Sequence, residues 1–94
     1  MNITLRQLTV FASVARHLSF TRAAEELHLT QPAVSMQVKQ LEGQLDIPLF
    51  EQLGKKIYLT DAGEEVYQYS RSISQQLDEL ETCLLYTSDA ADEE

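Results

Sequence analysis

Residues 20–42 form the sequence FTRAAEELHLTQPAVSMQVKQLE, and this stretch decides the fold. It holds two apolar patterns at helical spacing, separated only by His28, Leu29 and Thr30. We expect a helix over each pattern, with either Ser19 or Thr21 as the N-cap of the first. A pair of adjacent alanines in the first helix either admits another helix at close range or reflects good helix propensity alone. The apolar residues of this first pattern are Phe20, Ala23, Ala24 and Leu27.

The second pattern has clear signals for a helix start. Thr30 is a good N-cap, and Pro32 falls in the first turn, where its missing N–H costs little. Leu29 and Val34 occupy the positions of a hydrophobic staple. One side of this helix is an apolar stripe made by Val34, Val38, Leu41 and Leu45. The opposite face carries Pro32, Ser35, Met36 and Lys39, with Gln31 and Gln40 at its margins. Two helices joined by a tight turn, the second with one polar face, predict a helix-turn-helix.

The flanking segments extend this motif at both ends. A helix is predicted after a Thr4 N-cap, and it ends near Arg16 and His17. On the other side, a loop over residues 47–50 is followed by the turn signal Gly54-Lys55-Lys56 and a short β-prone run. We expect a small two-stranded wing there, with the lysines near its tip.

A long final helix is predicted after the wing. Thr60 is its N-cap, Asp61 lies in its first turn, and an apolar seam continues to Leu80. A helix of about 20 residues, roughly 30 Å long, overhangs so small a domain. We expect the seam to pair with a second copy of the chain, although it could instead fold back on its own core. The expected dimerisation residues are Val66, Tyr69, Ile73, Leu77 and Leu80.

The chain is therefore expected to be mainly α: a winged helix-turn-helix over residues 1–60 and a linker/dimerisation helix over residues 61–82. The net charge of −8 is unevenly distributed, because residues 1–60 carry +1 and residues 61–94 carry −9. A near-neutral head can bind DNA if its cations share one face. We expect no membrane partner, since no apolar run approaches the ~20 residues that a membrane helix needs. With no secretion signal and a single cysteine, Cys83, a cytoplasmic location is expected.

Residues 5–67, LRQLTVFASVARHLSFTRAAEELHLTQPAVSMQVKQLEGQLDIPLFEQLGKKIYLTDAGEEVY, carry a family resemblance. With the core SFTRAAEELHLTQPAVS, the link LE-x-x-L-x-I-P-LF and the start LT-x-A-G, the chain resembles the N-terminal DNA-binding domain of LysR-type transcriptional regulators. The resemblance covers residues 3 to about 82. The segments SMQVKQLE and LFEQLGKKIYLT look like the subgroup that controls Calvin-cycle carbon-fixation operons (CbbR-type regulators).

This resemblance implies a homodimer formed through the linker helix and bound to double-stranded DNA at an inverted-repeat operator. The third helix would lie in the major groove and the wing beside the adjacent minor groove. Family regulators also carry a C-terminal domain that binds a small-molecule effector, and we expect this chain to be a fragment without that domain. The chain departs from many family members at Met36 and Gln52, where arginine is common, so its target sequence and affinity should differ from theirs.

The expected contacts divide into base readers and backbone holders. Gln31 can bond a base edge, because its amide offers both a donor and an acceptor. Each lysine can neutralise a phosphate, or it can be an ordinary solvated residue. Thr30 has a full explanation as a cap alone. The expected DNA-binding residues are Thr21, Arg22, Thr30, Gln31, Pro32, Ser35, Met36, Lys39, Gln52, Lys55 and Lys56.

No enzyme is expected. The acidic pairs Glu25-Glu26 and Glu64-Glu65 are adjacent, so their carboxylates diverge on a helix, and solvated charge is their ordinary role. His17 and His28 lack a partner at metal-ligand spacing, and no cofactor loop is present. The alternative function is a protein-interaction or dimerisation module with the same fold and little DNA affinity.

The end of the sequence, CLLYTSDAADEE at residues 83–94, does not continue the seam or match the family pattern. Residues 83–93 are a direct translation of TGT-CTC-TTA-TAC-ACA-TCT-GAC-GCT-GCC-GAC-GAR, a type of end that transposase-based sequencing libraries attach. We therefore expect a non-native tail, with a natural acidic tail as the alternative. Different codons in the nucleotide sequence would exclude the first interpretation.

Overall fold

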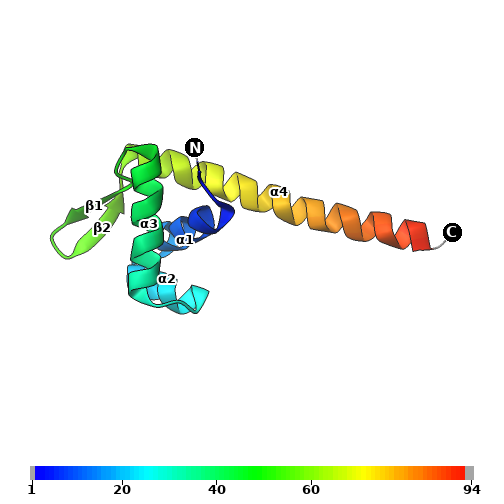
Figure 1. Ribbon diagram of the computed structural model, residues 1–94, viewed down its shortest axis with the longest axis horizontal. Helices are drawn as coiled ribbons and strands as arrows, with labels where there is room; N and C mark the ends of the chain where they lie inside the picture. The colour runs from blue at the N-terminus through cyan, green and yellow to red at the C-terminus, as the bar shows by residue number, and fades with distance from the viewer. Residues whose placement is uncertain (1, 93–94) are drawn as a thin grey trace.

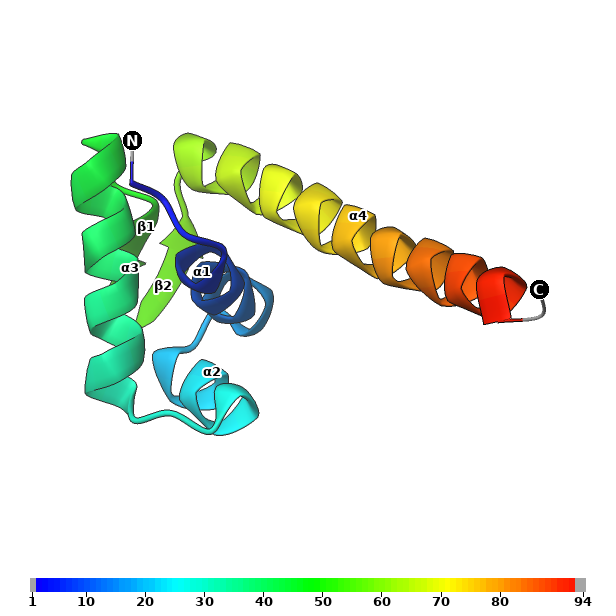
Figure 2. The same ribbon diagram turned by 45° about the vertical axis from the view of Figure 1, so that its right-hand side comes forward.

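The computed structural model describes residues 2–92, with side chains described as far as residue 85. A compact head is formed by three helices and a two-stranded wing, and the last helix projects from it (Figures 1 and 2). The molecule measures 61 × 26 × 19 Å, and its radius of gyration of 16.2 Å exceeds the ~12 Å of a compact chain of this length. The elements are α1 (Leu5–His17), α2 (Phe20–Leu27), α3 (Gln31–Leu45), β1 (Phe50–Leu53), β2 (Lys56–Leu59) and α4 (Asp61–Asp92).

The helix starts follow the caps in the sequence. Thr4 and Gln7 form a capping box at α1. Ser19 is the N-cap of α2, because its Oγ accepts a hydrogen bond from the Arg22 N–H at 3.1 Å. Thr30 caps α3 in the same way, with Pro32 in the first turn. Of the two candidates at α2, Ser19 is therefore the cap, and Thr21 lies within the helix.

Two apolar clusters form the core of the head. The first joins α1, α2 and α3 through Val10, Val14, Ala23, Ala24, Val34 and Val38. Ala23 and Ala24 are both buried, so the alanine pair does admit neighbouring helices at close range. The second joins α1, α3 and the loop before β1 through Phe11, Ala15, Leu41 and Leu49, and the first turns of α4 pack against it. The predicted stripe on α3 is confirmed as its buried side, with Leu45 half-buried at its end.

The wing is an antiparallel pair in which Phe50 faces Leu59 and Leu53 faces Lys56. Gly54 takes a positive φ of 67° in the turn, which glycine adopts without steric cost. Phe50 anchors the wing to the head, with ring centroids 5.3 Å from Phe11 and 5.8 Å from Phe20. The wing is therefore held against α1 and α2 as well as against its own partner strand.

The start of α4 packs closely on the loop before β1. Thr60 Oγ1 accepts from the Gly63 N–H at 3.0 Å and donates to the Pro48 carbonyl at 2.8 Å. A Cβ on Gly63 would overlap the carbonyl oxygen of Leu49, so only glycine allows this approach. The projecting helix is thus fixed to the head at its first turn.

The helix α4 continues past the expected domain boundary near Thr82 and ends at Asp92. The physical reason is that no proline or glycine follows Gly63, so nothing interrupts propagation of the helix. Residues 93 and 94 of the expected non-native tail lie outside the described residues.

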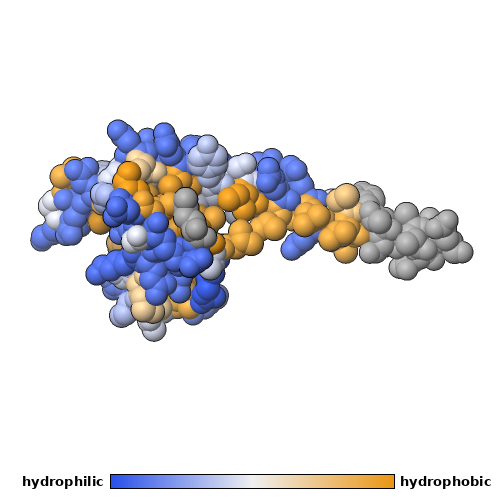
Figure 3. Space-filling view, turned by 45° about the horizontal axis from the view of Figure 1, so that its top comes forward, coloured by the Kyte–Doolittle hydropathy of each residue, from blue (hydrophilic) through white to orange (hydrophobic). Residues whose placement is uncertain are grey.

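The seam on α4 has two environments. Val66 is half-buried and packs on the second core cluster of its own chain. Farther along, Tyr69, Leu77 and Leu80 are exposed, while Ile73 is half-buried. Figure 3 shows the corresponding apolar strip along the projecting helix. Folding back on the core therefore accounts for the first turns of the seam and leaves the remainder uncovered.

Candidate nucleic-acid interface

The outward face of α3 is the centre of the candidate site. Gln31, Pro32, Met36 and Lys39 are exposed there, and Ser35 is half-buried. This face lies opposite the buried valine-leucine stripe, and no other element of the described chain covers it (Figure 2). A shallow hollow of about 420 Å³ is lined by Pro32, Ser35, Met36, Lys39 and Gln40. The structure therefore brings most of the expected base readers onto one open surface.

A second hollow, of about 260 Å³, joins α3 to the wing. Ser35 and Lys39 from α3 and Gln52 from β1 supply polar groups to it. The Gln52 side-chain amide also donates to the Gly54 carbonyl at 3.4 Å, which holds it along the turn of the wing. Because Ser35 and Lys39 line both hollows, the helix face and the wing form one continuous site.

The expected backbone-holding residues surround this face. Thr21 and Arg22 are exposed in the first turn of α2, and Lys55 and Lys56 are exposed at the turn of the wing. Figure 1 shows the wing extending to the side of α3, alongside the middle of that helix. Within the described part of the chain, the ion pairs all involve Glu26, so these cations have no internal carboxylate partner.

Two acidic residues have structural roles that sequence reasoning missed. Glu42 on α3 accepts from the backbone N–H of Leu49 at 2.7 Å and of Phe50 at 3.4 Å. These hydrogen bonds connect α3 to the base of the wing. The position of Glu42 three residues before the end of α3 gave no local signal, because one N–H group belongs to the next loop and the other to the first residue of β1.

Glu26 joins α2 to α1. Its carboxylate accepts from Ser13 Oγ at 2.7 Å, pairs with the Arg16 guanidinium and lies 3.1 Å from His17 Nε2. The hydrogen bond from Ser13, and then that with His17, lowers the pKa of Glu26 below its usual value. The expectation that Glu26 is only a solvated charge is therefore wrong. A serine among the apolar positions of α1 was the available signal, since a buried hydroxyl needs a partner.

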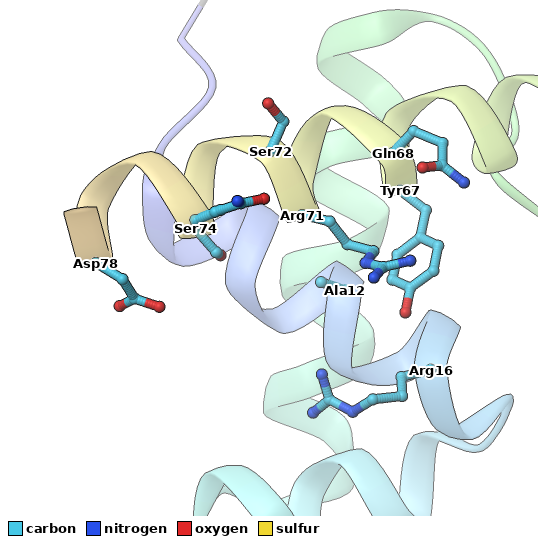
Figure 4. Close-up of a pocket in the computed structure, with 9 residues that line it drawn as sticks. Ala12, Arg16, Tyr67, Gln68, Arg71, Ser72, Ser74 and Asp78 are labelled. Atoms are coloured by element: carbon cyan, nitrogen blue, oxygen red, sulfur yellow. The ribbon is translucent and has the colours of Figure 1, made fainter.

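A wider hollow of about 740 Å³ lies between α1 and α4 (Figure 4). The Arg71 guanidinium lies 5.9 Å from the centroid of the Tyr67 ring there. None of its lining residues belongs to α3 or the wing, so it is separate from the candidate site.

Among the described residues no group of three or more His, Cys, Asp or Glu side chains could hold a metal ion. No helix within residues 2–92 is long and apolar enough to span a membrane.

Three short helices, an open polar face on the third and a two-stranded wing define a winged helix-turn-helix protein. Residues 5–64 match the family described as "Bacterial regulatory helix-turn-helix protein, lysR family". The chain belongs to this family of bacterial regulators.

Similar proteins include curated transcriptional regulators. The chain is 63% identical over 84 residues to the RuBisCO operon transcriptional regulator of Allochromatium vinosum, which covers 89% of the chain and 28% of that protein. It is 56% identical over 80 residues to the HTH-type transcriptional activator CmpR of Synechocystis sp., covering 85% of the chain and 26% of that protein. The chain thus spans about a quarter of the length of these relatives.

A solved structure agrees with the fold. The DNA-binding domain of BenM, in a complex with catB site 1 DNA, superposes with a TM-score of 0.87 at 31% identity, over 92% of this chain and 96% of that one. Both expectations of the sequence, a mainly α winged helix-turn-helix and a LysR-type relationship, are confirmed. These similarities favour the DNA-binding interpretation over an interaction module without DNA affinity.

Proposed function

We propose that this chain is the sequence-specific DNA-binding domain of a transcriptional regulator. The observation that carries the proposal is the open face of α3, which the described part of the chain leaves uncovered. The cations that flank it have no carboxylate partner among the described side chains. An α-helix with such a face fits the major groove of B-DNA, and the wing would then lie beside the adjacent minor groove. The role is binding rather than catalysis.

The individual roles follow from position and chemistry. Gln31 and Ser35 on α3 bond base edges, with Pro32 packing beside them. Lys39 neutralises a phosphate, and so do the wing lysines Lys55 and Lys56. Gln52 bonds a phosphate or base from the wing, with less strength than a charged group would have. Thr21, Arg22 and the N-cap Thr30 hold the DNA backbone at the two helix starts.

We further propose that two copies pair through α4 and that the regulator controls carbon-fixation genes. The uncovered part of the α4 seam supports the pairing, and an inverted-repeat operator would match the resulting two-fold symmetry. The similarity to the RuBisCO operon regulator supports the choice of genes. A DNA partner in a bacterium places the protein in the cytoplasm. A small-molecule effector would act through a further domain of the kind that family regulators carry.

The test is a DNA-binding titration at several salt concentrations. Affinity should fall linearly with the logarithm of salt concentration, by about 0.9 log units per log unit for each neutralised phosphate. Lys39→Ala should lower affinity for all sequences alike, and Gln31→Ala should relax preference at particular bases. Binding that neither depends on salt nor prefers an inverted repeat would favour the interaction module instead. DNA binding unchanged by both substitutions would overturn these roles for Gln31 and Lys39.

A further inference from the structure

We infer that Met36 determines part of the sequence specificity by packing on the C5-methyl group of a thymine in the major groove. This inference rests on the proposed function and adds a specific base to it. The reasoning begins with the position of Met36 and continues with its chemistry.

Met36 lies at the centre of the open face. At about 100° per residue, it points about 170° away from the middle of the buried stripe on α3. Its side chain is 53% exposed, although methionine gains free energy from burial. Pro32, one helical turn before Met36, lines the same hollow, and the polar groups beside this apolar pair are Ser35 and Lys39 on one side and Gln40 on the other. The face therefore has an apolar centre and polar flanks.

Apolar atoms in the centre of a recognition face have one specific counterpart in the major groove. Thymine alone presents a methyl group there, whereas guanine, cytosine and adenine present donors or acceptors that a thioether cannot satisfy well. A long, unbranched side chain can reach the methyl group without a fixed hydrogen-bond geometry. Met36 thus favours thymine at its contact position, and the polar residues around it orient the helix in the groove.

The experiment uses a duplex that this protein enriches from a random pool of double-stranded DNA. Each thymine of one half-site is replaced singly by deoxyuridine, which removes only the methyl group. At the contacted position the replacement should raise Kd by about fourfold, which corresponds to the free energy of burying one methyl group. Met36→Ala should bind the thymine and deoxyuridine duplexes equally, and Met36→Leu should retain a preference for thymine.

Leu5→Ala is the matched control, because Leu5 is 52% exposed but lies on α1, outside the open face. It should keep the full thymine preference. Met36→Arg should exchange that preference for guanine, which a guanidinium recognises through O6 and N7. The inference is overturned if no half-site thymine depends on its methyl group, or if Met36→Ala retains the dependence. Failure of the unmodified protein to enrich any duplex would instead overturn the proposed function itself.

Discussion

At the scale of single residues, three helix ends adopt a backbone conformation that favours glycine. Leu18, His28 and Asp46 follow α1, α2 and α3 with φ values of 49°, 58° and 57°. In each case the backbone of a residue other than glycine adopts the left-handed conformation, in which the backbone crowds the Cβ atom. Asp46 also places a negative charge at a helix C-terminus, which the macrodipole disfavours.

Asp46→Gly should therefore stabilise the protein by about 1 kcal/mol, a rise of roughly 4–8 °C in Tm for a domain of this size. Asp46→Asn is the control, because it removes the charge and keeps a side chain in the left-handed region. Thermal unfolding followed by circular dichroism measures both variants. A decrease in Tm for the glycine variant would show that the Asp46 side chain makes a stabilising contribution that outweighs backbone strain.

Glu26 gives the stability a pH dependence in the acidic range. Its pKa is lowered in the folded protein, chiefly by the Ser13 hydrogen bond, so the folded state favours the ionised carboxylate. The resulting stabilisation is complete above the ordinary carboxyl pKa and is lost as pH falls through the lowered folded value. Glu26→Gln should remove this component and flatten the profile of Tm against pH below about pH 5. Glu25→Gln changes an exposed neighbour and is the control. Its Tm should fall more steeply with decreasing pH than the Tm of the Glu26→Gln variant.

At the scale of elements, the wing is positioned by α3 as well as by its own strand pairing. The Glu42 carboxylate is the acceptor for two N–H groups at the base of the wing. Removing the carboxylate leaves the N–H groups of Leu49 and Phe50 without this acceptor in a partly buried region. An unsatisfied donor costs about 1–3 kcal/mol.

Glu42→Ala should lower the free energy of unfolding by this amount and speed amide exchange at Leu49 and Phe50. Glu42→Gln keeps one acceptor oxygen and should lose less. Denaturant unfolding and hydrogen exchange measure the two effects. Amide exchange at Leu49 and Phe50 as slow in the alanine variant as in the unmodified protein would contradict this role for Glu42.

At the scale of the whole molecule, the projecting part of α4 carries an apolar strip on which we expect a second copy to pack. Isolated helices are marginally stable in water, and exposed Tyr69, Leu77 and Leu80 add apolar surface along this one. A second α4 packed on the same strip would bury these residues without disturbing the head.

Leu77→Glu should therefore convert a dimer into a monomer and remove the concentration dependence of Tm. Gln68→Glu adds the same charge to the opposite side of α4 and should leave the dimer intact. Sedimentation equilibrium distinguishes the two states. If the Leu77 variant remains dimeric, the copies associate through another surface.

The sequence alone determined the starts of the helices, the caps of α1, α3 and α4, the wing and the open face on α3. These features depend on local spacing and on hydrogen bonds within three or four residues, as at Thr4, Thr30 and Thr60. Only the tertiary structure decided that Val66 packs on its own core and that Glu26 and Glu42 join separate elements. The reason is that these carboxylates accept hydrogen bonds from other elements, and Val66 is covered by other elements. Such contacts form only when segments distant in the sequence have packed together.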